Sequence, residues 1–142
     1  MKKAYSVPVS KAVMKMLKRD YKYQTHLRVD NWVYGKCIGH HANWKAYLDN
    51  PKENMVSITL VSDYASKGRL YTIARLFHYE FFKKLLYYVE AQTEAKIPAS
   101  KAILKFFEKY DLTEEDLKFS TAYKRWQRYQ EEESKVSLIP LW

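Results

Sequence analysis

The chain has little cysteine, little glycine and no long uninterrupted run of apolar residues. Its one cysteine, Cys37, cannot form an internal disulfide, which suits a reducing compartment. Five charged or histidine side chains interrupt the most apolar stretch, 70–89, so it is unlike a membrane span. Lysines also break up the apolar residues near the N-terminus, where a secretory signal needs a continuous apolar segment. The sequence therefore predicts a cytoplasmic protein without membrane contact.

Motifs for catalysis are equally scarce. Glycine occurs only at positions 35, 39 and 68, which leaves no glycine-rich loop for phosphate binding. No nucleophile elbow or zinc-protease pair occurs either. Four carboxylates could in principle meet around magnesium, but their spacing matches no motif: Asp30, Asp49, Glu53 and Asp63. Catalysis therefore ranks below binding, and we expect no cofactor and no small-molecule substrate.

A zinc site is the nearest approach to a metal motif. Cys37, His40 and His41 offer suitable ligand types, but structural zinc needs four ligands. His26 or His78 would have to join from elsewhere, and adjacent histidines rarely bind the same ion. The sequence therefore predicts no metal.

Positive charge is abundant and unevenly distributed. The 25 basic and 16 acidic residues give a net charge of +9. Residues 1–45 carry ten basic and two acidic groups, or +8, whereas 46–100 carry +1 and 101–142 are neutral. Such a concentration attracts phosphate polymers. Lysines outnumber arginines 19 to 6, which favours phosphate contacts over base reading.

The fold predicted from this sequence is α+β and predominantly helical. With 142 residues and 47% apolar content, the chain has the size and composition of a single domain, 1–142. We expect a basic mixed portion over 1–65 and a helical portion over 66–142. A small antiparallel sheet from the N-terminal half should pack on a long central helix.

Alternation and capping patterns place the elements of the basic portion. An extended segment over 4–9 precedes Ser10, which should cap a basic helix over 11–21. Alternating apolar residues predict strands over 25–34 and 55–61, with a helical turn over 42–48 between them.

The helical portion begins with a long apolar helix over 67–95, which leaves only a narrow polar stripe. It should be covered on most sides, by the core or by a second copy. Ser100 should cap the next helix, whose buried face is Ile103, Leu104, Phe106 and Phe107. Thr113 and Asp116 resemble a capping box that starts a further short helix. A final helix spans 121–133, and the tail 136–142 should pack back.

Residues 106–128 loosely resemble a helix-turn-helix unit, although Asp111 stands where the turn usually has glycine. That resemblance implies that the later helix enters the major groove, with Lys124, Arg125, Gln127 and Arg128 as base readers. The competing interpretation is structural: Arg128 pairs with Glu132 one turn later, and the aromatic residues belong to the core.

The N-terminal basic helix is the other candidate interface. Its lysines can follow a phosphate backbone while Tyr21 and Tyr23 stack on unpaired bases. A solvated helix face is an equally good interpretation, and a membrane-surface helix comes third. The predicted nucleic-acid-binding residues are Lys11, Lys15, Lys18, Arg19, Lys22, Arg28, Lys124, Arg125 and Arg128.

These observations predict a small, non-enzymatic accessory or regulatory protein that binds nucleic acid, with DNA ranked ahead of RNA. The alternative is a protein-interaction module. It would self-associate, for example as a homodimer, through the long apolar helix and dock an acidic protein partner.

Overall fold

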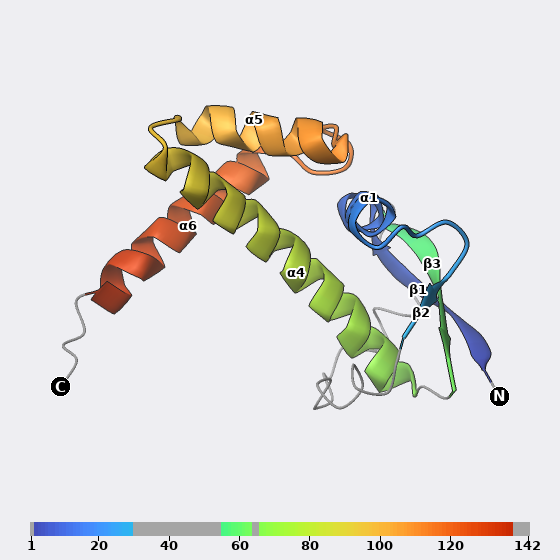
Figure 1. The fold of residues 1–142 in the computed structure, drawn as a ribbon. Helices are drawn as coiled ribbons and strands as arrows, with labels where there is room; N and C mark the ends of the chain where they lie inside the picture. The colour runs from blue at the N-terminus through green and yellow to red at the C-terminus, as the bar shows by residue number, and fades with distance from the viewer. Residues whose placement is uncertain (1, 30–54, 64–65, 138–142) are drawn as a thin grey trace. The chain divides into compact units, whose positions relative to one another are not determined.

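A computed structural model describes residues 2–29, 55–63 and 66–137 (Figure 1). Along the described chain the elements are β1 (Lys3–Ser10), α1 (Lys11–Asp20), β2 (Leu27–Arg28), β3 (Met55–Ser62), α4 (Lys67–Glu94), α5 (Ala99–Tyr110) and α6 (Phe119–Ser137). The predicted α+β, mainly helical class is confirmed. Internal contacts divide the chain into two compact units, Met1–Phe81 and Phe82–Trp142, so the boundary falls within α4. That 1–142 behave as one domain stays a prediction.

The first unit contains the sheet, in the order β1-β3-β2. The predicted extended segment and the strand over 55–61 are confirmed as β1 and β3, which pair antiparallel with Val7 opposite Ile58. Ile58 and Leu60 are buried and Ser57 is exposed, as the alternation in the sequence predicts. Pro8 fits in β1 because β1 is an edge strand, which pairs with a neighbour on one side only. Proline has no backbone N–H to donate, and its absence costs fewer hydrogen bonds there than in a central strand.

The sheet is mixed and not wholly antiparallel. β2 pairs with β3 in parallel, with Leu27 opposite Leu60 and Arg28 opposite Val61, and the N–H of Val29 donates to the carbonyl of Val61 at 2.9 Å. Parallel neighbours require a crossover of about a dozen residues or more. The 26 residues between β2 and β3 meet that requirement, whereas alternation within each strand carries no information on direction.

Helix α1 packs on the strands of its unit. The Ser10 side chain accepts a hydrogen bond from the N–H of Val13 at 3.2 Å, which confirms the predicted N-cap. Met16 and Leu17 are fully buried in the core that α1 forms with β1 and β3. Lys22 takes a left-handed backbone with φ of 57°, and this conformation ends the helix.

The long helix α4 was predicted within one residue of its observed end. Five consecutive residues, Leu70 to Ala74, are buried, and five residues span more than a full turn, so this part is covered on all sides. None of the six residues 75–80 is fully buried, and Leu76 and Tyr79 are exposed. The prediction that other residues cover α4 on most sides is therefore correct for only part of the helix.

The second unit is helical and has an aromatic core. Tyr88 of α4 meets Phe106 of α5 edge-on at 5.7 Å, and Phe107 of α5 meets Phe119 of α6 at 6.5 Å. Schellman motifs end α4 and α5, with Lys96 and Asp111 in left-handed conformations.

Three predictions for the second unit are wrong. Pro98, and not Ser100, is the N-cap of α5, because the Pro98 carbonyl accepts the first hydrogen bond of the helix, from the Ala102 N–H at 3.0 Å. Leu104 is 57% exposed, since the buried stripe of α5 runs through Ala102, Ile103, Phe106, Phe107 and Tyr110. Thr113 and Asp116 do bond through the Thr113 N–H and an Asp116 carboxylate oxygen at 2.9 Å, but they form a turn and no helix.

Several predictions concern residues outside the described part of the chain. These are strand residues 30–34, the helical turn at 42–48, tail residues 138–142, and the zinc-type residues Cys37, His40 and His41.

Candidate nucleic-acid interface

Three lysines of α1 share one face of the helix, and we call them the lysine row. Lys11, Lys15 and Lys18 are spaced four and three residues apart, a spacing that places side chains above one another on a helix. The buried residues of α1 lie on the opposite face: Ala12, Val13, Met16 and Leu17. Core packing of that apolar face leaves the lysine row on the outer face of α1, where Lys18 is exposed and Lys11 and Lys15 are half-buried.

Helix α1 itself contributes few carboxylates. Within α1 the only acidic residue is Asp20, which lies on the side of the buried face and not on that of the row. Lys18, Arg19 and Lys22 are exposed at or just after the C-terminal end of the helix, where cations also interact favourably with the helix dipole.

Two other basic residues of the first unit, Arg28 and Lys2, lie on or next to the sheet. Arg28 is exposed on β2, an edge strand. Lys2 forms an ion pair with Asp63 at 3.2 Å, so part of its charge is already neutralised. The structure therefore brings Lys11, Lys15 and Lys18 together on α1 and places Arg28 on a separate element.

The two tyrosines that follow α1 have different environments. Tyr23 is only 8% exposed, and its hydroxyl accepts the N–H of Thr59 at 3.0 Å, so it cannot stack on a base. The chain reverses at Lys22 and directs Tyr23 onto the sheet, a consequence that residue type alone does not reveal. Tyr21, by contrast, is 42% exposed.

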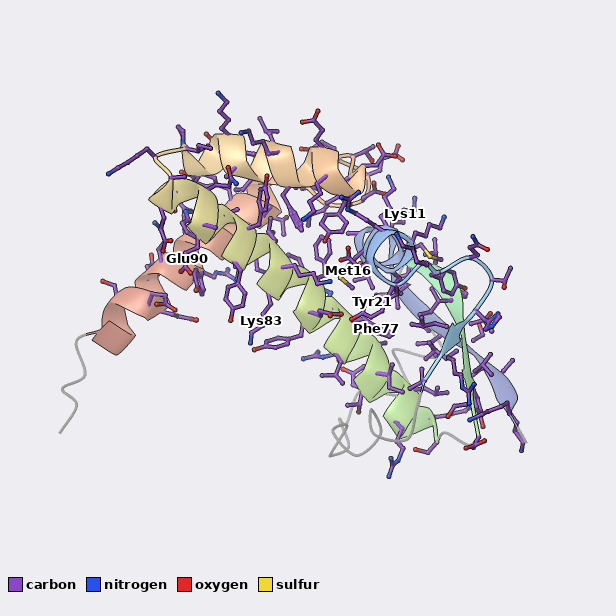
Figure 2. All side chains as sticks on the ribbon, in the orientation of Figure 1. Lys11, Met16, Tyr21, Phe77, Lys83 and Glu90 are labelled. Carbon is purple, nitrogen blue, oxygen red and sulfur yellow. The ribbon has the colours of Figure 1, made fainter. Side chains whose placement is uncertain are left out.

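Contacts with α4 hold Tyr21 in place. Its ring lies 6.3 Å from that of Phe77 (Figure 2). Its hydroxyl donates a hydrogen bond to Oε1 of Glu80 at 2.5 Å. Partial burial, this hydrogen bond and the negative charges of Glu80 and Asp20 all raise the pKa of Tyr21. Tyr21 therefore stays neutral at physiological pH.

The basic residues of α6 do not form a comparable row. Lys124 and Arg128 lie one turn apart on an exposed face, but the guanidinium of Arg125 lies 4.1 Å above the Phe82 ring. Three consecutive glutamates follow within the next two turns, at 131–133. The segment that joins α5 to α6 has eight residues, 111–118, more than the three or four of a helix-turn-helix motif. The helix-turn-helix resemblance therefore fails at its turn.

No ion pair joins Arg128 to Glu132 in the described part of α6, although the structural interpretation of the sequence expected one. The other half of that interpretation is correct for Trp126, which is 5% exposed and packs in the second unit.

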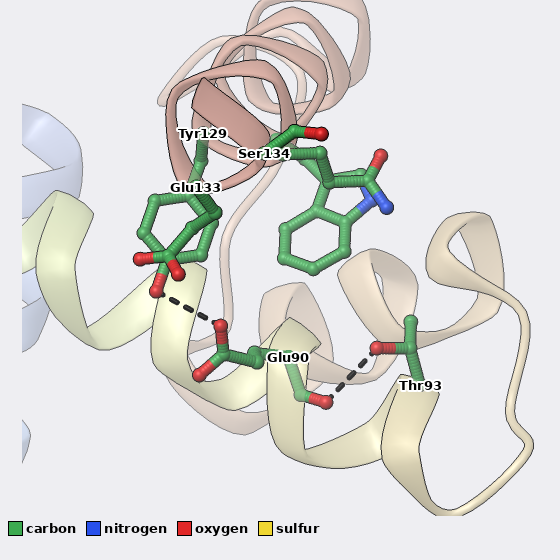
Figure 3. A pocket seen from close by; sticks show the side chains of 7 residues that line it. Glu90, Thr93, Tyr129, Glu133 and Ser134 are labelled. Carbon is green, nitrogen blue, oxygen red and sulfur yellow. Dashed lines mark hydrogen bonds between the residues drawn. The ribbon is translucent and has the colours of Figure 1, made fainter. Parts of the chain in front are cut away.

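A hollow in the second unit has the opposite charge. It has a volume of about 400 Å³ and is lined by Glu90, Thr93, Trp126, Tyr129, Gln130, Glu133 and Ser134 (Figure 3). The Tyr129 hydroxyl donates to Oε2 of Glu90 at 2.9 Å. Burial, the hydrogen bond to Glu90 and the negative charges of Glu90 and Glu133 raise the pKa of Tyr129, so the phenol stays neutral beside the carboxylates. Phosphate would be repelled here.

Sequence spacing gives no signal for this hollow, because Glu90 and Tyr129 are 39 residues apart. Only the packing of α6 against α4 within the second unit brings them together. Among the described residues no group of three or more acidic, cysteine or histidine side chains could hold a metal ion.

No protein-family model, curated protein or solved structure gives a significant match to this chain. No helix within the described ranges is long and apolar enough to cross a membrane. The functional argument therefore rests on the arrangement of the side chains themselves.

Proposed function

We propose that this chain is a small, non-enzymatic accessory protein that binds nucleic acid in the cytoplasm through the lysine row of α1. The observation that carries the proposal is the position of Lys11, Lys15 and Lys18 on one helix face opposite the buried face. Arg19 and Lys22 extend the positive surface near the end of the helix.

Phosphate contacts by lysine release counterions, and this release makes binding depend steeply on salt. The three lysines of the row predict a slope of log affinity against log salt of about −2 for a single strand, or about −3 for a duplex. With Arg19 and Lys22 engaged, the slope steepens by about a further 1.5.

The test compares two matched triple variants by fluorescence anisotropy with labelled DNA over a range of salt. Replacing Lys11, Lys15 and Lys18 by glutamine should weaken binding at low salt by about 100-fold and flatten the salt slope by about 2. The control replaces Lys124, Arg125 and Arg128 by glutamine, which removes the same formal charge from α6.

We expect the α6 variant to lose less than about threefold, because the neighbouring glutamates already oppose phosphate there. Circular dichroism should show that both variants remain helical. The proposal fails if the wild-type protein does not bind DNA at low salt, or if the α6 variant loses more affinity than the α1 variant.

Self-association is the second candidate function, and α4 and α5 supply the observation that favours it. Leu76, Tyr79 and Leu104 are large apolar or aromatic side chains with exposed fractions of 37%, 58% and 57%. Covering such residues in a second copy would remove apolar surface from water. Light scattering on a sizing column tests this: a dimer that lacks DNA affinity favours self-association, and a monomer contradicts it.

A further inference from the structure

Tyr21 provides an exposed aromatic ring at one end of the lysine row. It follows Lys18 by three residues, and Lys22 comes directly after it. Tyr21 as a whole residue is 42% exposed, and its ring lies beside that of Phe77 (Figure 2). This contact and the hydrogen bond to Glu80 fix the orientation of the ring. Holding the ring beforehand lowers the entropy lost when a ligand stacks on it.

The charges around Tyr21 restrict what can contact it. The Glu80 carboxylate accepts the Tyr21 hydroxyl, and Asp20 is the neighbouring residue, so a phosphate placed against this ring would be repelled. A nucleobase is uncharged and has a flat face that can stack on the ring. The tyrosine therefore suits a base, whereas the lysines suit the phosphates.

A duplex cannot satisfy both preferences. Its bases are stacked inside, and a protein must extrude a base before an aromatic side chain can stack on it, at a cost in unpairing energy. A single strand can turn a base toward Tyr21 while its backbone follows Lys18 and the rest of the lysine row. The row from Lys11 to Lys18 extends about 10 Å along the helix at 1.5 Å per residue, which is enough for a short stretch of backbone.

We infer that the ligand of α1 is single-stranded nucleic acid, with the lysine row on successive phosphates and the Tyr21 ring stacked on one base. This inference rests on the proposed nucleic-acid-binding function and specifies the class of ligand for the same site.

The experiment measures anisotropy with a labelled oligothymidine of about 20 nucleotides and with a duplex of equal length. The wild-type protein should bind the single strand more tightly than the duplex. Tyr21→Ala should weaken single-strand binding by about tenfold, while the salt slope stays as in the wild type because no phosphate contact is lost.

Three further variants separate stacking from other effects. Tyr21→Phe keeps the ring and should retain most of the affinity. Tyr87→Ala removes a tyrosine of similar exposure, 51%, from the second unit and should leave binding unchanged. Glu80→Gln removes the negative charge beside the ring and should strengthen binding by about twofold. Thermal unfolding followed by circular dichroism checks that each variant is folded.

The outcomes distinguish this inference from the proposed function. Equal binding of both probes, together with unchanged affinity of Tyr21→Ala, overturns the single-strand inference and leaves the lysine row as a general phosphate site. Absence of binding to either probe overturns the proposed function and this inference with it.

Discussion

Helices α1 and α6 each contain four basic residues, but the acidic and aromatic groups near those residues differ between the two helices. α1 has one carboxylate, Asp20, and it lies on another face from the lysine row. α6 has three consecutive glutamates at 131–133, and Arg125 lies over an aromatic ring. Residues 1–81 carry 14 basic and six acidic groups, or +8, whereas 82–142 carry 11 and ten, or +1. Two helices with equal numbers of cations therefore have different local electrostatic fields, because the field also depends on the neighbouring carboxylates.

The largest expected effect tests whether the two units unfold together. Leu17→Ala in the first unit and Phe106→Ala in the second remove side chains that are at most 1% exposed. Such truncations cost about 2–5 kcal/mol each. We expect one urea unfolding transition by circular dichroism, with a lower midpoint in both variants, because α4 contributes core residues to both units. Two transitions, each moved by only one variant, would contradict the single-domain prediction.

A smaller effect separates stability from binding. Lys22 and Lys96 both have left-handed backbones, with φ of 57° and 68°, a conformation that glycine adopts without steric cost. Each replacement by glycine should raise the free energy of unfolding by about 0.5–1 kcal/mol.

Only Lys22→Gly should also weaken DNA binding and flatten the single-strand salt slope by about 0.7. Urea unfolding and anisotropy measured on the same preparations check both parts. Equal effects of the two variants on binding would remove Lys22 from the interface.

The smallest effect concerns the tyrosines that pair with glutamates in each unit. Folding raises the pKa of Tyr21 and of Tyr129 above the usual value of about 10. Each therefore contributes stability that is fully present below about pH 10 and is lost as the pH rises through the folded-state pKa.

Ultraviolet titration of the phenols should show that Tyr21→Phe and Tyr129→Phe each remove one late-ionising group. Each variant should also lessen the fall of stability above about pH 10. An unchanged titration curve in either variant would show that the corresponding hydroxyl ionises normally.

Local patterns predicted most of the elements, although the Ser100 cap and the helix expected after Thr113 were wrong. They also failed where a side chain depends on distant partners. The alternation at Ile58 and Leu60 and the capping by Ser10 involve only residues a few positions apart. Sequence patterns therefore predict both directly. The burial of Tyr23 depends on a chain reversal and on the Thr59 N–H, 36 residues away. The direction of β2 beside β3 likewise depends on how a long connection returns, which no strand pattern encodes.

The candidate site likewise has a part that sequence patterns predict and a part that they do not. The spacing of Lys11, Lys15 and Lys18, together with the helix period, already placed the lysine row on one face, since both operate within one element. The concentration of positive charge in residues 1–45 is likewise visible in the sequence.

Tertiary structure alone decided that Tyr21 is exposed while Tyr23 is buried. It also decided that Glu80 holds the Tyr21 ring and that the Arg125 guanidinium lies over the Phe82 ring. These outcomes depend on packing between elements far apart along the chain. Short-range periodicity in the sequence does not predict such packing.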